Sequence, residues 1–341
     1  MTLSRITLDA PYLLFMGDVG DDGHAKTGHG IAFWRPELCA GQMRLPGCAV
    51  DMGLPELDVD AAVAAGVRTA IIGVASTGGV LLDDWVPALA ALASAGIDIA
   101  SGTHSKINDS ADLIAAAKAG DARLIDVRVP PQNLPVGRGG RRTGKRVLTV
   151  GTDCAVGKKY SALALHREFE NRGINSDFRA TGQTGIMIAG EGIPIDAVVA
   201  DFVSGAAEVL SPDNDADHWD VIEGQGSLLH PSYAGVSLGL LHGSQPDAIV
   251  LCHDAGREEL LGLEGYFPLP PIQEVIDSVL QAARITNPDA VCAGISVNTS
   301  SMSDVERRDY LAGLGEQSSL PCVDPVATGM APVADFLQEK C

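Results

Sequence analysis

The residues best suited to chemistry form a glycine-rich segment between an apolar run and a helical pattern, Gly151-Thr152-Asp153-Cys154-Ala155-Val156-Gly157-Lys158. Its glycines allow the backbone N–H groups to converge, and the start of the following helix adds the positive end of a dipole. Lys158 can then reach a terminal phosphate oxygen. We therefore predict a phosphate-binding loop here, continued by Lys159 and Tyr160, in place of an ordinary strand-to-helix turn.

The spacing of this loop differs from the usual nucleotide-hydrolysing form. It reads G-x5-G-K, one residue longer than G-x4-G-K-[ST], and Lys159 stands where a Ser or Thr would bind magnesium. Loss of that hydroxyl removes a ligand from a magnesium nucleotide, whereas a second lysine favours a bound diphosphate. We expect a diphosphate to be held without hydrolysis and without a metal, although Thr152, Tyr160 or Ser161 could supply a compensating oxygen.

Further polar clusters that contain glycine follow where other strands should end, namely TGQTG (181–185), EGQGSLLHP (223–231), LCHDAGR (251–257) and GISVNTSS (294–301). In an open parallel sheet the carboxyl ends of the strands line one crevice, so these segments should meet around the loop. Each segment alone is more typical of a simple turn. From them we take as substrate-binding candidates Thr181, Gln183, Thr184, Gln225, Ser227 and Arg257.

Three residues are candidates for removing a proton from an amine nucleophile. Glu223 ends an apolar strand, and His230 lies in the same polar segment. His253 lies in another of these segments. Asp201 and Glu208 lie seven residues apart on one face of a predicted helix, where they could hold an ammonium group. Asp201 lies inside an apolar stretch, so we expect it to be partly buried with a partner. We expect Asp201, Glu223 or His230 to be catalytic and Glu208 to bind substrate; solvent-facing acids, a solvated strand end and a structural histidine are the alternatives.

Two polar turns in the first part of the chain contain cations. AKTGHGIAFWRPE (25–37) includes Lys26 and Arg35, and SGTHSKI (101–107) includes Lys106. They could bind an anionic substrate group, and we take Lys26 as the candidate. Each is equally typical of a surface loop.

Alternating strand and helix patterns must position these groups. In the first part of the chain strands are predicted at 67–75, 97–102 and 122–128, and helices at 84–95 and 110–119. After a Pro-, Gly- and Arg-rich linker (130–146), strands are predicted at 146–151, 219–224, 247–253 and 290–298, and helices at 157–171, 195–210 and 272–283. This order predicts an α/β fold with mostly parallel sheets and two domains, residues 1–135 and 136–341.

Composition excludes several classes of protein. The 341 residues carry 24 Lys and Arg against 44 Asp and Glu, and a formal charge of −20 opposes binding to nucleic acid or to an anionic membrane. Seven scattered cysteines without a C-x-x-C pair indicate neither a disulfide framework nor a zinc site. No signal peptide and no long apolar run is evident, so we expect a cytoplasmic protein.

The loop resembles that of dethiobiotin synthetase and related amide-forming P-loop enzymes, whose pattern is G-T-D-T-x-V-G-K. That resemblance implies that Asn298, at the end of a predicted strand, hydrogen-bonds an adenine edge; a capping role is the alternative. The whole chain is similar to the DUF1611 family over ordered segments that include AKTGHG (25–30), IASGTHSKIND (99–109), TGQTGIMIAG (181–190) and DAVVADFVSGAAE (196–208). This similarity implies a Rossmann-like N-terminal domain and a P-loop NTPase-like C-terminal domain.

The family resemblance further implies an N-acetyltransferase that moves acetyl from acetyl-CoA to the amine of D-glutamate. The loop would then hold the diphosphate of acetyl-CoA, Arg141, Arg142 or Lys145 could meet its 3′-phosphate, and N–H groups of TGQTG or GQGS could stabilise the oxyanion. We expect small-molecule partners and a homo-oligomer. The alternatives are an ATP-dependent ligase or kinase, and a nucleotide- or NAD-binding regulatory protein, although no G-x-G-x-x-G follows a first strand.

Overall fold

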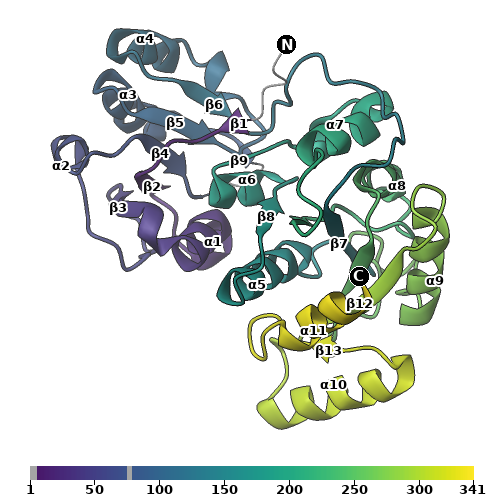
Figure 1. Ribbon diagram of the computed structural model, residues 1–341. Helices are drawn as coiled ribbons and strands as arrows, with labels where there is room; N and C mark the ends of the chain where they lie inside the picture. The colour runs from purple at the N-terminus through teal and green to yellow at the C-terminus, as the bar shows by residue number, and fades with distance from the viewer. Residues whose placement is uncertain (1–5, 75–78) are drawn as a thin grey trace. The chain divides into compact units, whose positions relative to one another are not determined.

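Two units make up the chain in the computed structural model, which describes residues 6–74 and 79–341 (Figure 1). The N-terminal unit comprises residues 6–131 and Gln183–Ala197, and the C-terminal unit comprises Gln132–Gly182 and Val198–Cys341. The chain therefore returns to the N-terminal unit for a short segment after the second unit has begun. The single boundary predicted between residues 135 and 136 does not include this return.

The N-terminal unit is built on a five-stranded sheet in the order β3-β2-β4-β5-β6, with all neighbours parallel. Its strands are β2 (Tyr12–Gly17), β3 (Cys39–Arg44), β4 (Thr69–Ile72), β5 (Asp98–Ser101) and β6 (Leu124–Asp126). Its helices are α1 (Lys26–Trp34), α2 (Val59–Ala64), α3 (Val86–Ser94), α4 (Ala111–Gly120) and α6 (Gln183–Ala189). A short antiparallel pair, β1 (Ile6–Thr7) with β9 (Glu191–Gly192), includes part of the return segment.

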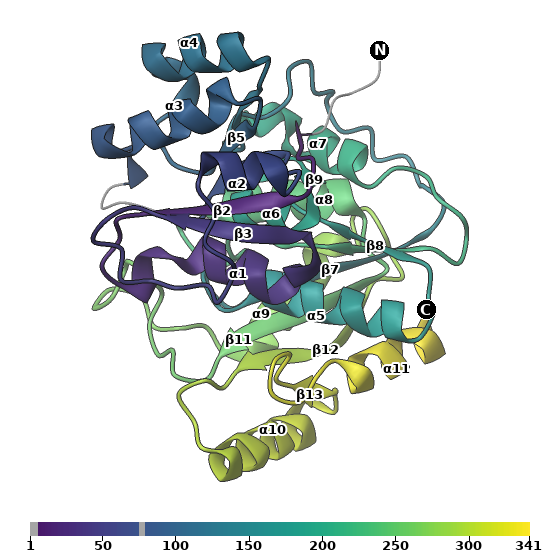
Figure 2. The ribbon, with the colours of Figure 1, turned by 90° about the vertical axis from the view of Figure 1, so that its left-hand side faces the viewer.

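Helices cover both faces of this sheet because successive crossovers run in opposite directions from β2. The chain moves from β2 to β3 on one side and then returns across β2 to β4 and onwards. Figure 2 shows α1 on one face and α2, α3 and α4 on the other. The strand order reverses between β2 and β4, and such a switch point leaves a crevice at the carboxyl ends of the strands.

The C-terminal unit holds a six-stranded parallel sheet in the order β13-β12-β11-β7-β10-β8. Its strands are β7 (Lys145–Gly151), β8 (Ser176–Arg179), β10 (Trp219–Ile222), β11 (Ala248–Asp254), β12 (Val291–Asn298) and β13 (Cys322–Val323). Its helices are α5 (Lys158–Asn171), α7 (Val203–Leu210), α8 (Ala234–Ser244), α9 (Ile272–Ala283), α10 (Asp304–Ser318) and α11 (Ala331–Lys340). Helices α5 and α11 pack together on one face, and α8 packs on the sheet beside α7 and α9.

Burial explains why the central strands read as unbroken apolar runs. Residues of β11 from Ala248 to His253 are all buried, and β7 is buried along most of its length. A parallel strand that is covered by helices on both faces needs apolar residues at successive positions. This core fixes the carboxyl ends of β7, β10 and β11 side by side, and the polar loops start there.

The α/β class with two mostly parallel sheets is confirmed, and so are most predicted elements. Helix α9 and strands β7, β11 and β12 lie within a residue or two of the predicted ranges. The predicted strand 67–75 is β4, and its last position, Ala75, lies outside the described residues. The predicted helix at 195–210 is wrong as one element: it is two 3₁₀ turns, Ile195–Ala197 and Ala200–Phe202, followed by α7.

The break in that predicted helix coincides with the junction between the units. Residues up to Ala197 belong to the N-terminal unit and those from Val198 to the C-terminal unit, and Val198 and Val199 are in no helix. Separately, across residues 6–74 and 79–341 no helix combines the length and apolar character that crossing a bilayer requires. All seven cysteines are free thiols.

Candidate functional site

The loop that follows β7 forms a cradle of backbone N–H groups. A Cβ at Gly151 would come within 2.8 Å of both Lys158 Nζ and the Asp153 carbonyl oxygen, so only glycine fits there. Gly157 has a φ of 100°, a left-handed conformation that glycine adopts without strain. In the described part of the chain the N–H groups of Gly157, Lys158 and Lys159 donate to no acceptor. Free N–H groups in succession at the start of a helix bind anions such as phosphate.

Two lysines complete this cradle. Lys158 is buried and its Nζ donates to the Asp153 carbonyl oxygen at 2.8 Å, while Lys159 Nζ lies 5.4 Å from the centre of the Tyr160 ring. Burial lowers the pKa of both lysines, and the negative charge of Glu223 partly opposes this shift in each. An ammonium group removed from water gains strongly from an anionic partner. The cradle is therefore a site for a polyanion.

Asp153 holds the loop in shape. Its Oδ1 accepts from the Cys154 N–H at 2.6 Å, and its Oδ2 accepts from Arg257 Nη1 and from the Leu261 N–H, both at 2.7 Å. The carboxylate is fully buried and its charge is balanced by the guanidinium. Asp153 and Arg257, which the sequence predicted to bind cofactor and substrate respectively, thus contact each other. In this arrangement they position the loop.

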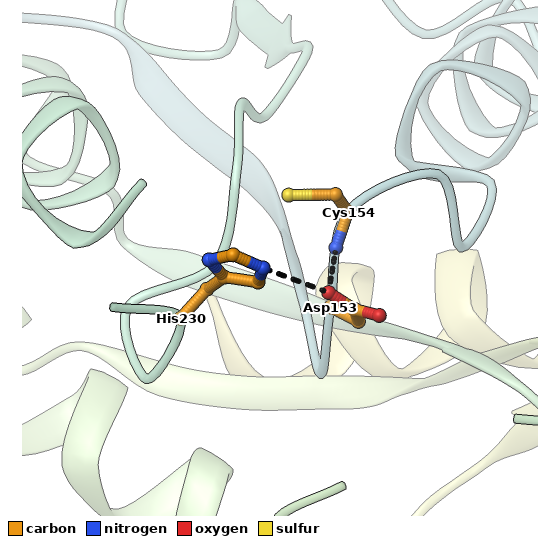
Figure 3. Close-up of side chains that lie close together, drawn as sticks. All are labelled: Asp153, Cys154 and His230. Atoms are coloured by element: carbon orange, nitrogen blue, oxygen red, sulfur yellow. Dashed lines mark hydrogen bonds and ion pairs between the residues drawn. The ribbon is translucent and has the colours of Figure 1, made fainter. Parts of the chain in front are cut away.

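His230 and Cys154 lie close to this carboxylate (Figure 3). His230 Nε2 is 3.9 Å from Asp153 Oδ1, and one potential ligand atom of each residue lies within 4.8 Å of the others. The spacing would suit a metal, but the donors have protein partners: His230 Nδ1 accepts from the Ser232 N–H, and Nε2 lies 3.2 Å from the Leu261 carbonyl oxygen. Burial raises the pKa of Cys154, which keeps it a thiol. The cluster braces the loop.

Glu223 follows β10 directly and brings two of the predicted segments together. Its Oε2 accepts from the Thr181 and Gly182 N–H groups at 2.9 and 3.0 Å, and its carbonyl oxygen accepts from Thr181 Oγ1. Gln225 Nε2 donates to the same Thr181 hydroxyl at 2.9 Å. Glu223 is a buried carboxylate close enough to influence Lys158 and Lys159. This is the strongest acid–base candidate at the edge of the sheet.

Side chains from the neighbouring strands hold the other side of the loop. Ser227 Oγ donates to the Thr152 carbonyl oxygen, and the Thr152 hydroxyl lies 3.2 Å from His253 Nδ1. His253 Nε2 lies 3.1 Å from the Tyr310 hydroxyl, and burial lowers the pKa of this histidine, so the ring is neutral at neutral pH. Sequence reasoning missed Tyr310, because it lies on α10 with no local spacing that links it to the loop.

The remaining loop residues are close to the cradle but differ in exposure. Val156 is buried, Ala155 is exposed with a φ of 55°, and Tyr160 is half-buried with a pKa that burial raises. Asn298 Nδ2 donates to Asp254 Oδ2 at 3.1 Å at the ends of β12 and β11. Its role in binding adenine stays a prediction.

The surroundings expected for Asp201 and the helix face expected for Glu208 are corrected. Asp201 was expected to be partly buried with a partner; it is exposed in a 3₁₀ turn, because the helix begins only at Val203. Glu208 lies on α7, but its carboxylate accepts from the N–H groups of Arg138 and Gly139 in the linker. Glu208 therefore holds the linker in place, and Asp201 and Glu208 do not share one helix face.

The basic linker residues also differ from their expected role beside the loop. Arg142 Nη1 donates to the carbonyl oxygens of Glu208 and Ser211, and Nη2 to those of Gly243 and Ser244. Burial lowers the pKa of Arg142 to about 10. Lys145 begins β7, at the opposite edge of the sheet from the loop, with its Nζ 5.5 Å from the centre of the Trp219 ring. Arg141 is exposed.

Three of the predicted substrate-binding residues belong to the N-terminal unit. Gln183 and Thr184 begin α6, and Lys26 begins α1 with an exposed side chain. The Thr184 hydroxyl lies 3.2 Å from that of Thr27, which joins the two helices. The TGQTG segment is therefore divided: Thr181 and Gly182 contact Glu223, and Gln183 onwards is part of the other unit.

Known proteins resemble the chain along nearly its whole length. Residues 135–334 match the DUF1611 family model, described as a P-loop domain of unknown function, and residues 43–130 match its Rossmann-like N-terminal domain. The D-glutamate N-acetyltransferase of Tritonibacter scottomollicae is 48% identical over 97% of this chain and 99% of its own length. The protein of the same name from a Pseudoalteromonas species is 46% identical over 94% and 96%.

A solved structure adds to this similarity. The crystal structure of a DUF1611 family protein from Anabaena variabilis is 31% identical and has a TM-score of 0.81, covering 96% of this chain and 99% of that one. The match in fold accompanies the match in both family models. The chain belongs to the DUF1611 family, with a Rossmann-like N-terminal domain and a P-loop C-terminal domain.

Proposed function

We propose that this protein is a D-glutamate N-acetyltransferase that uses acetyl-CoA as its acetyl donor. The observation that carries the proposal is identity of 46–48%, over at least 94% of the chain, with two proteins of that name. The geometry of the loop supports the same conclusion, because it suits a donor that is bound through a diphosphate group. Coenzyme A carries such a group, which links its adenosine part to its pantetheine part.

The cradle would hold that diphosphate as an anchor. The free N–H groups of Gly157, Lys158 and Lys159 face no competing acceptor among the described residues, and the two lysines supply positive charge. Because burial lowers the lysine pKa values, a bound anion stabilises their charged forms more than it would at the surface. The affinity for a diphosphate is therefore higher because folding has already removed water from the two lysine ammonium groups.

The same geometry disfavours phosphoryl transfer. Lys159 replaces the hydroxyl that would bind magnesium, and two hydroxyls that could compensate are engaged: Thr152 with His253, and Ser161 with the Gly157 carbonyl oxygen and with Ser296. A magnesium nucleotide would therefore lack the usual Ser or Thr ligand at the start of the helix, and Tyr160 is the remaining hydroxyl of the three. This is the structural argument against the ATP-dependent ligase alternative.

Acetyl transfer then requires a base and an oxyanion site. The amine nitrogen attacks the thioester carbonyl carbon and a C–N bond forms, the C–S bond breaks, and coenzyme A leaves as a thiolate. We assign the amine proton to the Glu223 carboxylate, which then returns a proton to the thiolate. Glu223 suits this role better than exposed Asp201, because it is buried and close enough to influence both lysines of the cradle.

Backbone N–H groups beside Glu223 are suited to the oxyanion. The Thr181 and Gly182 N–H groups already donate to Glu223, and the Gly224 N–H donates to Thr149 Oγ1. Within the described chain the N–H groups of Gln225 and Gly226 donate to no acceptor. Two such donors in a half-buried loop can stabilise developing negative charge. Of the two predicted segments, GQGS is therefore the better candidate.

The experiment is a thiol-release assay with the purified full chain. Acetyl-CoA is mixed with a panel of D- and L-amino acids and free thiol is followed, with product identity checked by mass spectrometry. We expect the largest signal with D-glutamate, giving N-acetyl-D-glutamate. Equal thiol release with every acceptor, or none above the rate without acceptor, would refute the proposal.

A further inference from the structure

A cavity of about 340 Å³ opens in the N-terminal unit at the carboxyl ends of its strands. Its lining comes from separate segments: Thr27 of α1, Ile72 at the end of β4, Thr103 and His104 after β5, Arg128 after β6, and Gln183 of α6. These segments flank the switch point between β2 and β4, where open α/β sheets bind their ligands. Its volume is that of a small-molecule pocket.

Three side chains that line this cavity carry polar atoms without partners in the described residues. Arg128 Nε donates to the Gly102 carbonyl oxygen at 3.0 Å and Nη1 lies 3.4 Å from Asp196 Oδ2, whereas Nη2 makes no hydrogen bond. The Gln183 amide and the His104 ring make none either. His104 is exposed and Arg128 and Gln183 are half-buried, so a ligand that enters the cavity can bind these polar atoms in place of water.

The sign of the charge indicates the class of ligand. Arg128 is the one formal cation among the described lining residues, and none of them is Asp or Glu; the Asp196 contact is long and half-exposed. One guanidinium with neutral donors matches a single negative charge, and its planar fork matches a carboxylate. Met187, Ile72 and Val74 supply an apolar wall for methylene groups.

We propose that this cavity binds a small carboxylate-bearing molecule of amino-acid size, with Arg128 as its charge partner and Gln183 as a further hydrogen-bonding group. The preference for a carboxylate follows from the cavity alone. The choice of D-glutamate as the first ligand to test rests on the proposed function. Nothing in the phosphate loop is needed for this binding.

Calorimetric titration of the full chain tests the proposal with D-glutamate, glutarate and inorganic phosphate as probes. Arg128→Gln is expected to weaken carboxylate binding by about tenfold or more, since it removes a charged hydrogen-bond donor, while Arg128→Lys retains part of it and Gln183→Leu loses several-fold. The control is Arg68→Gln, which removes an exposed arginine of the same unit and should change nothing. Circular dichroism and thermal unfolding report whether each variant is folded.

The outcomes separate this inference from the proposed function. Binding of glutarate but not D-glutamate, lost in Arg128→Gln, would support the carboxylate site while the acceptor assignment fails. Unchanged D-glutamate and glutarate affinity in a folded Arg128→Gln variant would overturn the inference even if acetyl transfer proceeds. Phosphate that binds more tightly than either carboxylate would also overturn it.

Discussion

The phosphate loop of the C-terminal unit and the cavity of the N-terminal unit both lie at the carboxyl ends of parallel strands, yet they are built in opposite ways. In the loop several side chains are hydrogen-bonded to the protein: Asp153 to Arg257, Thr152 to His253, and Lys158 to the Asp153 carbonyl oxygen. In the cavity, Arg128 and Gln183 retain polar atoms without partners among the described residues. The loop is preorganised around backbone donors, whereas the cavity leaves polar side-chain atoms available to a ligand.

This difference separates two tasks. A preorganised loop can hold a common handle, such as a diphosphate, at little cost in ordering. A cavity lined by side chains from several segments can vary with the ligand while the sheet stays the same. We therefore expect changes in the C-terminal unit to affect donor binding and chemistry, and changes in the cavity to affect only the affinity for its own ligand.

The largest expected effect is on turnover. Glu223→Gln removes the proposed base and should lower kcat by about 10²- to 10⁴-fold, with acetyl-CoA affinity little changed. Arg128→Gln should weaken binding of D-glutamate or glutarate to the cavity and leave kcat nearly intact. Steady-state kinetics checks this split, with Asp201→Asn as the control that retains activity because that carboxylate is exposed. Similar loss of kcat in both variants would break the comparison.

A matched pair of glycine substitutions tests how tightly each region is packed. A Cβ at Gly224 would lie 1.7 Å from the Thr149 carbonyl oxygen, so Gly224→Ala should lower the free energy of unfolding by about 3 kcal/mol. A Cβ at Gly102 meets the flexible side chains of Gln183 and Met187 at 3.2 Å, and Gly102→Ala should change stability by less than about 1 kcal/mol. Urea unfolding measures both; equal losses would contradict the contrast.

Donor affinity should depend on the buried lysine. Lys158→Ala removes a charged donor from the cradle and is expected to weaken acetyl-CoA binding by about 10- to 100-fold. Binding of D-glutamate or glutarate should be unaffected. Isothermal titration with each ligand provides the measurement. A variant that loses the carboxylate but keeps acetyl-CoA would reverse the roles assigned to the two regions.

A smaller effect is expected from pH. Burial lowers the pKa of Lys158 and Lys159, so acetyl-CoA affinity should begin to fall at a lower pH than for exposed lysines, as the ammonium groups lose their protons. Stability has the opposite sign: between the lowered pKa and the ordinary one the unfolded chain binds more protons, so the free energy of unfolding rises with pH. Affinity that stays flat to alkaline pH would contradict this.

The control for that profile is a charge that does not titrate. A Lys158→Arg, Lys159→Arg variant keeps both positive charges across the same pH range. Its acetyl-CoA affinity, measured by titration at each pH, should show no alkaline fall. If the affinity of the variant falls in the same way, the titration of another group causes the fall.

The loop could be predicted because its signal is local. Gly151, Gly157, Lys158 and Lys159 lie within nine residues, and the strand and helix on either side are typical patterns. The meeting of TGQTG with Glu223 followed from a general property of parallel sheets. These inferences need no knowledge of side-chain direction.

The cavity and the roles of several acids could not be predicted in the same way. Thr27, His104 and Gln183 lie in segments that the sequence marked as candidates for binding substrate, but no spacing links them to one another or to Arg128. The apolar residues around Asp201 indicated a helix and burial, but the chain changes units at residue 198 and Asp201 is exposed in a 3₁₀ turn before α7. Such outcomes depend on tertiary packing.

The central claim is that the loop beginning at Gly151 holds the diphosphate of acetyl-CoA and leaves it intact while acetyl is transferred. The most direct measurement counts free thiol, N-acetyl-D-glutamate and inorganic phosphate in one reaction of acetyl-CoA with D-glutamate, without ATP and with EDTA present. We predict one thiol for each N-acetyl-D-glutamate and no phosphate release. A requirement for ATP and magnesium, with phosphate formed in proportion to product, would contradict the account.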